Sequence, residues 1–344
     1  MRRLTGLVLT LALLILASCA SVLIGTNPIP VSAAWDSFTA GTSEIGHAVT
    51  GLRMPHIDTT SEVAGIVWDL RVPRTLLGLF VGLAIGAAGA LTQGHTRNPI
   101  ADPGMLGVNA GAACAVVTGV YVAGITSPLA YMAFGLLGAI IASATVFGIA
   151  ALTGTSPITL VLAGTGLTAV LTAITSAIVL SDTASLDAWR FWSVGSTEGR
   201  GLDVFWAALP FLLVGLVVAL ASGFFLNILS LGDDMTQALG SRVLVIRAVG
   251  VLGITLLVGA ATAACGPIVF LGLVVPHLAR AITGPDYRWI IPYAALIGAT
   301  LLLICDVIGR VVGRPGEVQV GVMLAFVGAP FLIAMVRTTT MSTV

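Results

Sequence analysis

Apolar runs of about 20 residues recur along almost the whole chain, and each is long enough to cross a hydrocarbon core of about 30 Å. Only 9% of the 344 residues are charged, whereas roughly 25% is usual in a water-soluble domain. A surface that faces water cannot be built from so few charges. We therefore predict an all-α integral membrane protein, a polytopic bundle of ten transmembrane helices over residues 4–25, 71–93, 104–124, 128–153, 159–181, 203–227, 244–265, 266–283, 289–311 and 319–337.

No connection combines low hydrophobicity, charge and low complexity as a linker or a soluble second domain would. We expect one transmembrane domain over residues 1–344, with no room for an ATPase of its own. An even number of spans places both termini in the cytoplasm. In this threading residues 26–70 form short helices on the outer face, 182–202 is a second outer element, and 228–243 is a cytoplasmic loop. The cytoplasmic segments then carry a net positive charge, although the bias in Arg alone is slight.

The N-terminus allows two interpretations. Basic Arg2 and Arg3, an apolar stretch and Cys19 resemble a bacterial lipoprotein signal with its lipidated Cys. Apolar character continues to Ile24, however, and everything downstream is also membrane-spanning. We therefore favour a retained first helix, with Arg2 and Arg3 in the cytoplasm and Cys19 as an ordinary small residue.

Five polar or proline-broken segments interrupt the apolar runs. They are RVPR at 71–74, RNPIADPGMLG at 97–107, LGDDMTQALG at 231–240, GPIVFLGLVVPHLAR at 266–280, and the pair DVIGR and EVQVG within 306–321. In the third segment, Gly232 and Gly240 bracket a short helix whose first turn carries two Asp, which favour the helix dipole there. Such a helix suits docking into a groove of a partner, and equally suits a solvated connector.

In this order and spacing, the five segments closely resemble the FecCD-type permeases of ABC importers for ferric siderophores, haem and vitamin B12. The resemblance runs from about Val67 to Arg337, with departures at 313–316 and at Val318-Gln319. It implies a type II importer permease in a bacterial cytoplasmic membrane. Its partners would be a second permease, two cytoplasmic ATPases and an external binding protein that delivers the cargo. We expect a ferric siderophore as cargo, with haem and vitamin B12 as alternatives.

Carried over residue by residue, the resemblance implies that Arg71, Arg74 and Arg310 form an outward basic cluster that receives acidic residues of the binding protein. The planar fork of Arg suits carboxylates. The implied ATPase-coupling element comprises Gly232, Asp233, Asp234, Met235, Thr236, Gln237, Ala238, Leu239 and Gly240. We interpret Asp306 as a partner that positions Arg310, because four residues separate them on one helix.

Pro276, His277 and Arg280 lie at the predicted cytoplasmic end of a span. A proton relay is one interpretation, because ionisable groups in a membrane are often functional. We favour a structural role that orients the helix end near the ATPase. His47, His56 and His95 are isolated in the sequence, so we expect no metal site.

Two other classes compete with a permease. An ion-coupled secondary transporter generally places carboxylates or interrupted helices near the bilayer midplane. Asp306 is the one candidate, and we expect it near a membrane face instead. A membrane enzyme needs clustered His, Asp or Glu within the spans, and the sequence has no such cluster. We therefore expect a transporter subunit that is not an enzyme and binds no cofactor itself, with ATP and Mg²⁺ on the partner ATPases. The identity of the siderophore, and of the second permease, stays open.

Overall fold

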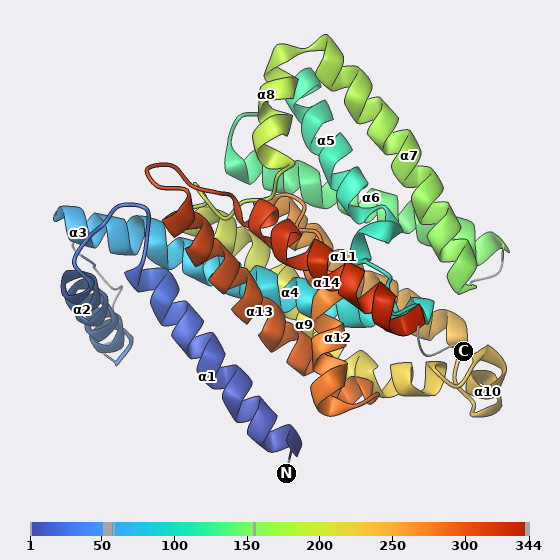
Figure 1. The fold of residues 1–344 in the computed structure, drawn as a ribbon. Helices are drawn as coiled ribbons and strands as arrows, with labels where there is room; N and C mark the ends of the chain where they lie inside the picture. Colours follow the sequence, from blue (N-terminus) through green and yellow to red (C-terminus); the bar gives the residue numbers. More distant parts are fainter. Residues whose placement is uncertain (1, 51–56, 58, 154–155, 341–344) are drawn as a thin grey trace.

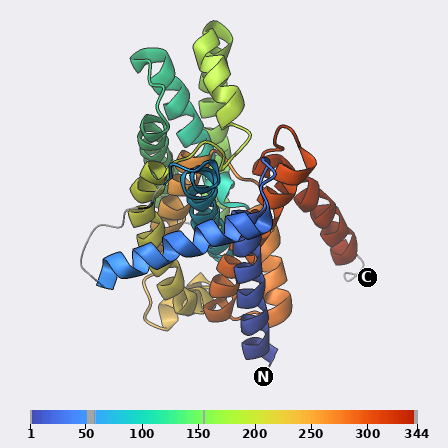
Figure 2. The same cartoon turned by 90° about the vertical axis from the view of Figure 1, so that its left-hand side faces the viewer.

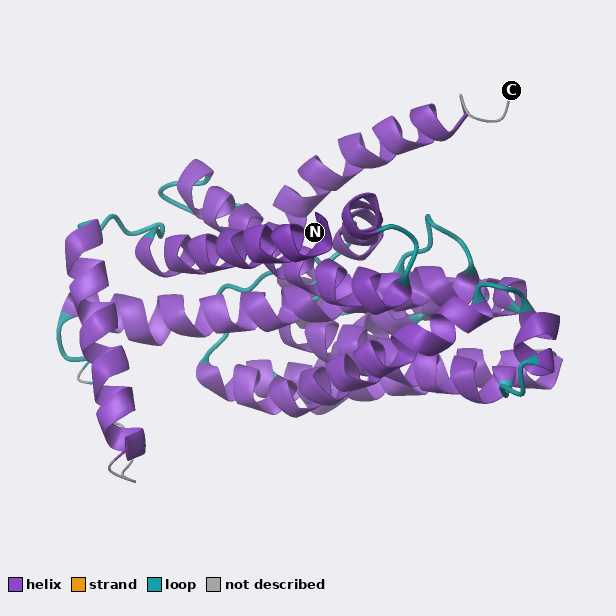
Figure 3. Ribbon diagram, turned by 90° about the horizontal axis from the view of Figure 1, so that it is seen from below, coloured by secondary structure: helices purple, strands orange, loops and turns teal. Residues whose placement is uncertain are grey.

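The computed structural model describes residues 2–50, 57, 59–153 and 156–340, and within them every regular element is a helix (Figures 1 and 3). The α-helices are α1 Arg2–Leu23, α2 Val31–Thr50, α3 Glu62–Gly65, α4 Val72–Thr96, α5 Val108–Ala123, α6 Pro128–Thr153, α7 Pro157–Ser181, α8 Thr183–Trp192, α9 Leu202–Leu229, α10 Asp233–Ala238, α11 Val243–Cys265, α12 Leu271–Thr283, α13 Tyr287–Val312 and α14 Val320–Thr340. A π-helical turn η1 (Ile66–Arg71) joins α3 to α4, and a 3-10 turn η2 (Pro103–Leu106) precedes α5.

Each of the ten predicted spans contains an apolar helix. Within the described residues, seven helical stretches are long and apolar enough to cross a membrane, and the apolar parts of α5, α12 and α14 are shorter. Large apolar side chains cover the outside of the bundle, for example Leu152 and Leu180, which are 89% and 86% exposed. Hydrocarbon covers such side chains without cost, so the predicted membrane bundle is confirmed.

Two spans differ from the prediction. Residues 266–283 were expected to be one helix, but the 13-residue α12 starts only at Leu271. The backbone before it turns through positive φ at Gly266 and Phe270, 76° and 66°. In the span predicted over 104–124, helix α5 begins at Val108, after η2. Irregular backbone at membrane depth needs protein around it, and both breaks lie against neighbouring helices.

The segment 26–70 also differs from the expected series of short helices. Helix α2 is a single helix of 20 residues that lies crosswise to α1 (Figure 2). It is held by Trp68, whose ring stacks on Phe38 with centroids 5.8 Å apart and whose indole N–H donates to the Ser37 carbonyl. Residues 51–56 and 58, including His56, lie outside the described residues. A crosswise amphipathic helix at one end of the bundle is the geometry of an interfacial element.

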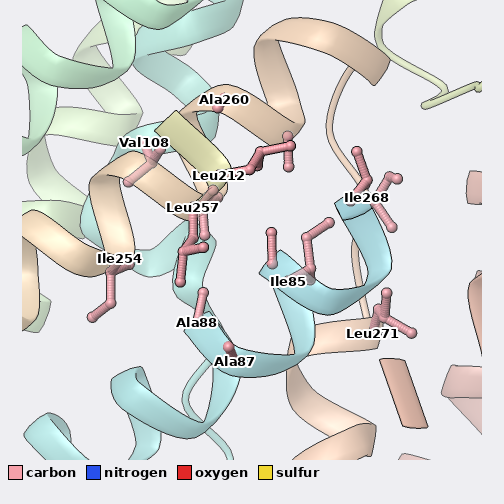
Figure 4. Packing of buried hydrophobic residues seen from close by; sticks show 14 of the residues in the cluster. Ile85, Ala87, Ala88, Val108, Leu212, Ile254, Leu257, Ala260, Ile268 and Leu271 are labelled. Carbon is pink, nitrogen blue, oxygen red and sulfur yellow. The ribbon is translucent and has the colours of Figure 1, made fainter. Parts of the chain in front are cut away.

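Helix α4 forms the centre of the bundle (Figure 1), packed against α9, α11, α12 and α13. Its Ile85, Ala87 and Ala88 face side chains such as Leu212 and Leu257 of the surrounding helices (Figure 4). Small residues let the backbones approach closely. A Cβ on Gly86 would stand 2.1 Å from the Ala294 carbonyl oxygen of α13. Gly86 thus lies on a packing surface of α4 against α13.

The two ends of the bundle carry different polar groups. We call the end that holds Arg71, Arg74 and Arg310 the arginine end, and the opposite end, which holds α10, the α10 end. Helix α1 runs between them: the Arg3 carbonyl accepts a hydrogen bond from Tyr293 near the start of α13, and the Ile24 carbonyl accepts one from Arg310 near its end. The predicted outer and cytoplasmic elements therefore separate onto opposite ends.

Candidate functional site

The three arginines expected to act together do meet in the structure. Arg71 ends η1, Arg74 lies in the first turn of α4, and Arg310 lies in the last turn of α13. They come together because α4 and α13 pack antiparallel along their lengths. All three side chains are nonetheless buried, with exposures of 4%, 8% and 2%.

Arg74 is paired with two carboxylates. Its Nε lies 3.2 and 3.1 Å from the two Asp306 oxygens, and its Nη2 donates to Asp306 Oδ1 at 2.8 Å. Its Nη1 donates to Glu317 Oε2 at 2.6 Å. Asp306 also accepts from Arg310 Nη2 at 2.8 Å and from the Thr197 hydroxyl at 2.9 Å. The Asp306–Arg310 pair was expected; the stronger bidentate pair with Arg74 was not.

Arg71 and Arg310 hold the end of α1. Arg71 donates to the carbonyls of Val22, Leu23 and Asn27 at 3.2, 2.7 and 2.8 Å. Arg310 Nη1 donates to the carbonyls of Ser21 and Ile24, both at 2.9 Å. The last carbonyls of a helix lack intrahelical partners and carry partial negative charge, so cations there satisfy them. Both arginines therefore fix α1 to the rest of the bundle.

A cavity of about 610 Å³ opens over this cluster, lined by Arg71, Arg74, Glu198, Arg200, Arg310 and Glu317 among others. Burial, and then repulsion from Glu317, raises the pKa of the Glu198 carboxyl at its rim. The expected positive patch is thus largely compensated by internal carboxylates. The sequence could not indicate this, because the partner Glu317 is 243 residues from Arg74.

At the α10 end, the bracketed helix is present. Helix α10 covers Asp233–Ala238, between Gly232 and Gly240, whose φ values of 110° and 80° suit glycine. The Thr236 hydroxyl is buried and donates to the Gly232 carbonyl at 2.6 Å. Met235 and Leu239, one turn apart, are 53% and 58% exposed. The element therefore presents an apolar face outward while its base is anchored.

That anchor is an ion-pair cluster which the sequence did not reveal. Asp233 pairs with Arg97, which ends α4, and accepts from Arg247 Nη2 of α11 at 3.0 and 2.8 Å. Arg247 is fully buried. Only the general rule that a buried guanidinium needs an acidic partner could have indicated that Arg247 is paired. Asp233 thus ties α10 to two spans, whereas Asp234 is exposed.

The third group of predicted residues lies on α12. Pro276 is inside the helix, and His277 Nδ1 lies 3.0 Å from the Leu273 carbonyl. The Arg280 guanidinium lies 5.9 Å from the centre of the Tyr287 ring of α13. The first contact lies within α12, and the second joins the end of α12 to the start of α13. His95 is buried in α4 against Gly250, and within the described residues no group of three or more His, Cys, Asp or Glu could hold a metal ion.

An all-helical bundle with apolar spans, polar groups at its two ends and a short helix bracketed at one of them defines a multi-pass membrane protein. A model of the FecCD transport family matches residues 13–338, so this chain belongs to that family of transport permeases.

Named relatives match over most of the chain. The chain is 44% identical to the ferric enterobactin transport system permease protein FepD of Escherichia coli (strain K12), over 95% of this chain and 93% of that protein. It is 34% identical to the iron(3+)-hydroxamate import system permease protein FhuB of Bacillus subtilis (strain 168), over 96% and 82%. The cobalamin import system permease protein BtuC of Halobacterium salinarum is 34% identical over 79% and 73%.

The fold also has a solved counterpart. The inward-facing structure of a proposed metal-chelate type ABC transporter superposes with a TM-score of 0.80 over 97% of this chain and 99% of that chain, at 24% identity. This likeness supports the overall architecture of the bundle.

Proposed function

We propose that this chain is the membrane-spanning permease subunit of an ABC importer that moves a ferric siderophore across the bacterial cytoplasmic membrane. The observation that carries the proposal is the 44% identity to the ferric enterobactin permease over nearly the full length of both chains. The iron-hydroxamate permease adds a second iron-chelate relative. Iron enclosed by a chelator needs no iron ligands from the permease.

Vitamin B12 is a second candidate cargo, because the cobalamin permease matches at 34% identity. To separate the two, the chain is expressed with its ATPase, binding protein and second permease in cells that lack siderophore permeases. Radiolabelled ferric enterobactin should accumulate, and unlabelled ferric siderophore should compete, whereas cobalamin and haem should not. Uptake of radiolabelled cobalamin in the same cells, without uptake of ferric enterobactin, would identify a B12 permease.

The proposal includes the partners and the orientation. The chain acts as one domain, residues 1–344, beside a second permease, with the arginine end outside and both termini in the cytoplasm. It binds no cofactor itself; ATP and Mg²⁺ belong to two partner ATPases. Arg71, Arg74 and Arg310 receive acidic side chains of an external binding protein, and Pro276, His277 and Arg280 orient the end of α12.

We also assign coupling to residues 232–240. An importer needs a rigid connection between its ATPase and its spans, and the Asp233 ion pairs supply one from α10 to α4 and α11. The exposed Met235 and Leu239 suit an apolar groove in the ATPase. Because the α10 anchor and the exposed face use different side chains, the anchor can be weakened without touching the contact surface.

Asp233→Asn tests this assignment, with Asp234→Asn as the matched control. Both remove one negative charge from the first turn of α10, but only Asp233 pairs with the buried Arg247. We expect Asp233→Asn to lower the amount of siderophore moved per ATP hydrolysed, while basal ATPase activity persists. Asp234→Asn leaves the anchor intact, so any effect should appear in ATPase binding, while the amount of siderophore moved per ATP stays at the wild-type value. If both variants move the wild-type amount of siderophore per ATP hydrolysed, the Asp233 ion pairs are not the coupling route.

A further inference from the structure

A binding protein that docks on Arg74 meets an arginine already paired with two internal carboxylates. The Asp306 side chain is 2% exposed and is held by Arg310 and Thr197 as well as by Arg74. The Glu317 side chain is 16% exposed, and its one other side-chain partner among the described residues is the neutral hydroxyl of Thr26. Removing Asp306 from this cluster would leave two buried guanidiniums with Glu317 as their one carboxylate among the described residues, whereas removing Glu317 would free one arm of one guanidinium. Glu317 is therefore the exchangeable partner.

We propose that docking is a carboxylate exchange: an acidic side chain of the binding protein replaces Glu317 on Arg74 Nη1, and Glu317 moves away. The inference rests on the proposed docking role of the arginine end. Arg74 and Glu317 both line the cavity at this end, so an incoming side chain reaches them from the same space. Arg74 stays compensated throughout, which avoids the large penalty of an unpaired buried charge.

The other two arginines do not offer such an exchange. Arg71 donates to backbone carbonyls of α1 and the segment after it, and Arg310 donates to α1 carbonyls and to Asp306. Displacing those acceptors would detach α1. Arg71 and Arg310 therefore keep the cluster in place while Arg74 changes partner.

The exchange would transmit the docking of the binding protein to the membrane-spanning helices. Glu317 belongs to the segment between α13 and α14, residues 313–319, which the Val318 N–H fastens to the Gly309 carbonyl at 3.1 Å. Immediately after it, the Gly321 N–H donates to the Gly195 carbonyl at 3.1 Å. Release of Glu317 removes the ion pair that joins this segment to α4. A docked partner thereby loosens the start of α14 relative to the central helix.

Glu317→Gln tests the exchange in the complete transporter in lipid nanodiscs, with the binding protein that supports uptake as the probe. Gln keeps the size of Glu and removes the internal competitor. We expect the Kd to fall about tenfold, the factor that corresponds to one charge-assisted hydrogen bond. Glu198→Gln is the control, because Glu198 lines the same cavity and lies close enough to feel the charge of Arg74, but the salt bridges of Arg74 within the described residues go to Asp306 and Glu317. Its Kd should change less.

A second measurement reports on the exposure of the segment 313–319. Gly316→Cys is tolerated, since a Cβ there would lie 3.5 Å from its nearest neighbour. Binding protein should raise the maleimide reactivity of this Cys, measured at the peptide level by mass spectrometry. Added Glu317→Gln should raise it before any protein is added. Reactivity that falls on docking, with no change in Glu317→Gln, would overturn the exchange.

Arg74→Lys separates this inference from the docking proposal on which it rests. Lys keeps a charge for Asp306 but loses the second arm of the fork. A binding protein that binds Arg74→Lys as tightly as wild type does not dock on Arg74, which refutes the docking site and the exchange together. A binding protein that loses affinity for Arg74→Lys, yet binds Glu317→Gln no more tightly than wild type, refutes the exchange alone.

Discussion

The buried ion cluster at the arginine end should make a large contribution to stability, and Asp306→Asn is the most direct perturbation of it. Asp306 is 1% exposed and accepts hydrogen bonds from Arg74, Arg310 and Thr197. Asn keeps the shape and one acceptor oxygen but removes the charge. Two buried guanidiniums are then left with Glu317 as their single carboxylate.

The size of the effect follows from that imbalance. Breaking a buried ion pair by removing one partner costs roughly 3–5 kcal/mol, and the surviving Glu317 pair places this variant near the lower value. An unfolding entropy of about 2.1 cal/mol/K per residue amounts to about 0.7 kcal/mol/K for 344 residues. A loss of about 3 kcal/mol therefore lowers the Tm by about 4 °C.

The Tm is measured in detergent as the temperature at which half of the protein loses its monodisperse peak in size-exclusion chromatography. Asp187→Asn is the control, because the Asp187–Arg190 pair is exposed and such pairs contribute little. Adding Arg310→Met to Asp306→Asn should recover part of the loss by removing an uncompensated charge. A Tm for Asp306→Asn equal to that of Asp187→Asn would show that the cluster does not stabilise the bundle.

Three further outcomes are expected. The hydrogen bonds that the Arg288 guanidinium donates hold the pKa of Asp286 below its usual range. The contribution of Asp286 to the free energy of unfolding is therefore complete above about pH 4 and is lost as the pH falls through the depressed pKa. Wild-type Tm should accordingly drop more steeply than that of Asp286→Asn in acid, and parallel curves would contradict this. For the orientation, a Cys at exposed Asp187 should react with an impermeant maleimide on intact cells, and a Cys at Gln237 only after permeabilisation; the reverse would invert the proposed topology. Gly86→Ala should cost roughly 1–3 kcal/mol of stability by overpacking against a carbonyl of α13, which would lower the Tm. Gly166→Ala adds its methyl group in open space and should keep the wild-type Tm. An equal drop in both variants would contradict the packing argument.

The membrane architecture and the location of the functional segments could be predicted from the sequence. Apolar runs of the required length determine a spanning helix locally, since every backbone group is satisfied within the segment. The short helix at 233–238 could also be predicted from local features, because Gly232 and Gly240 permit backbone angles that other residues avoid. The i, i+4 pair of Asp306 and Arg310 also follows from helix geometry alone.

Only the tertiary structure decided what the charged residues do. The sequence indicated that Arg71, Arg74 and Arg310 share an end of the bundle, but not that Glu317 and the carbonyls of α1 occupy them. Likewise, the sequence placed Asp233 in the first turn of α10 without its partners Arg97 and Arg247. The segment 266–270 was predicted as part of a helix, although Gly266-Pro267 is a helix-breaking pair; in the structure it is irregular, with positive φ at Gly266 and Phe270. A charge in an apolar chain must find a partner, and which partner it finds depends on which distant helices pack together.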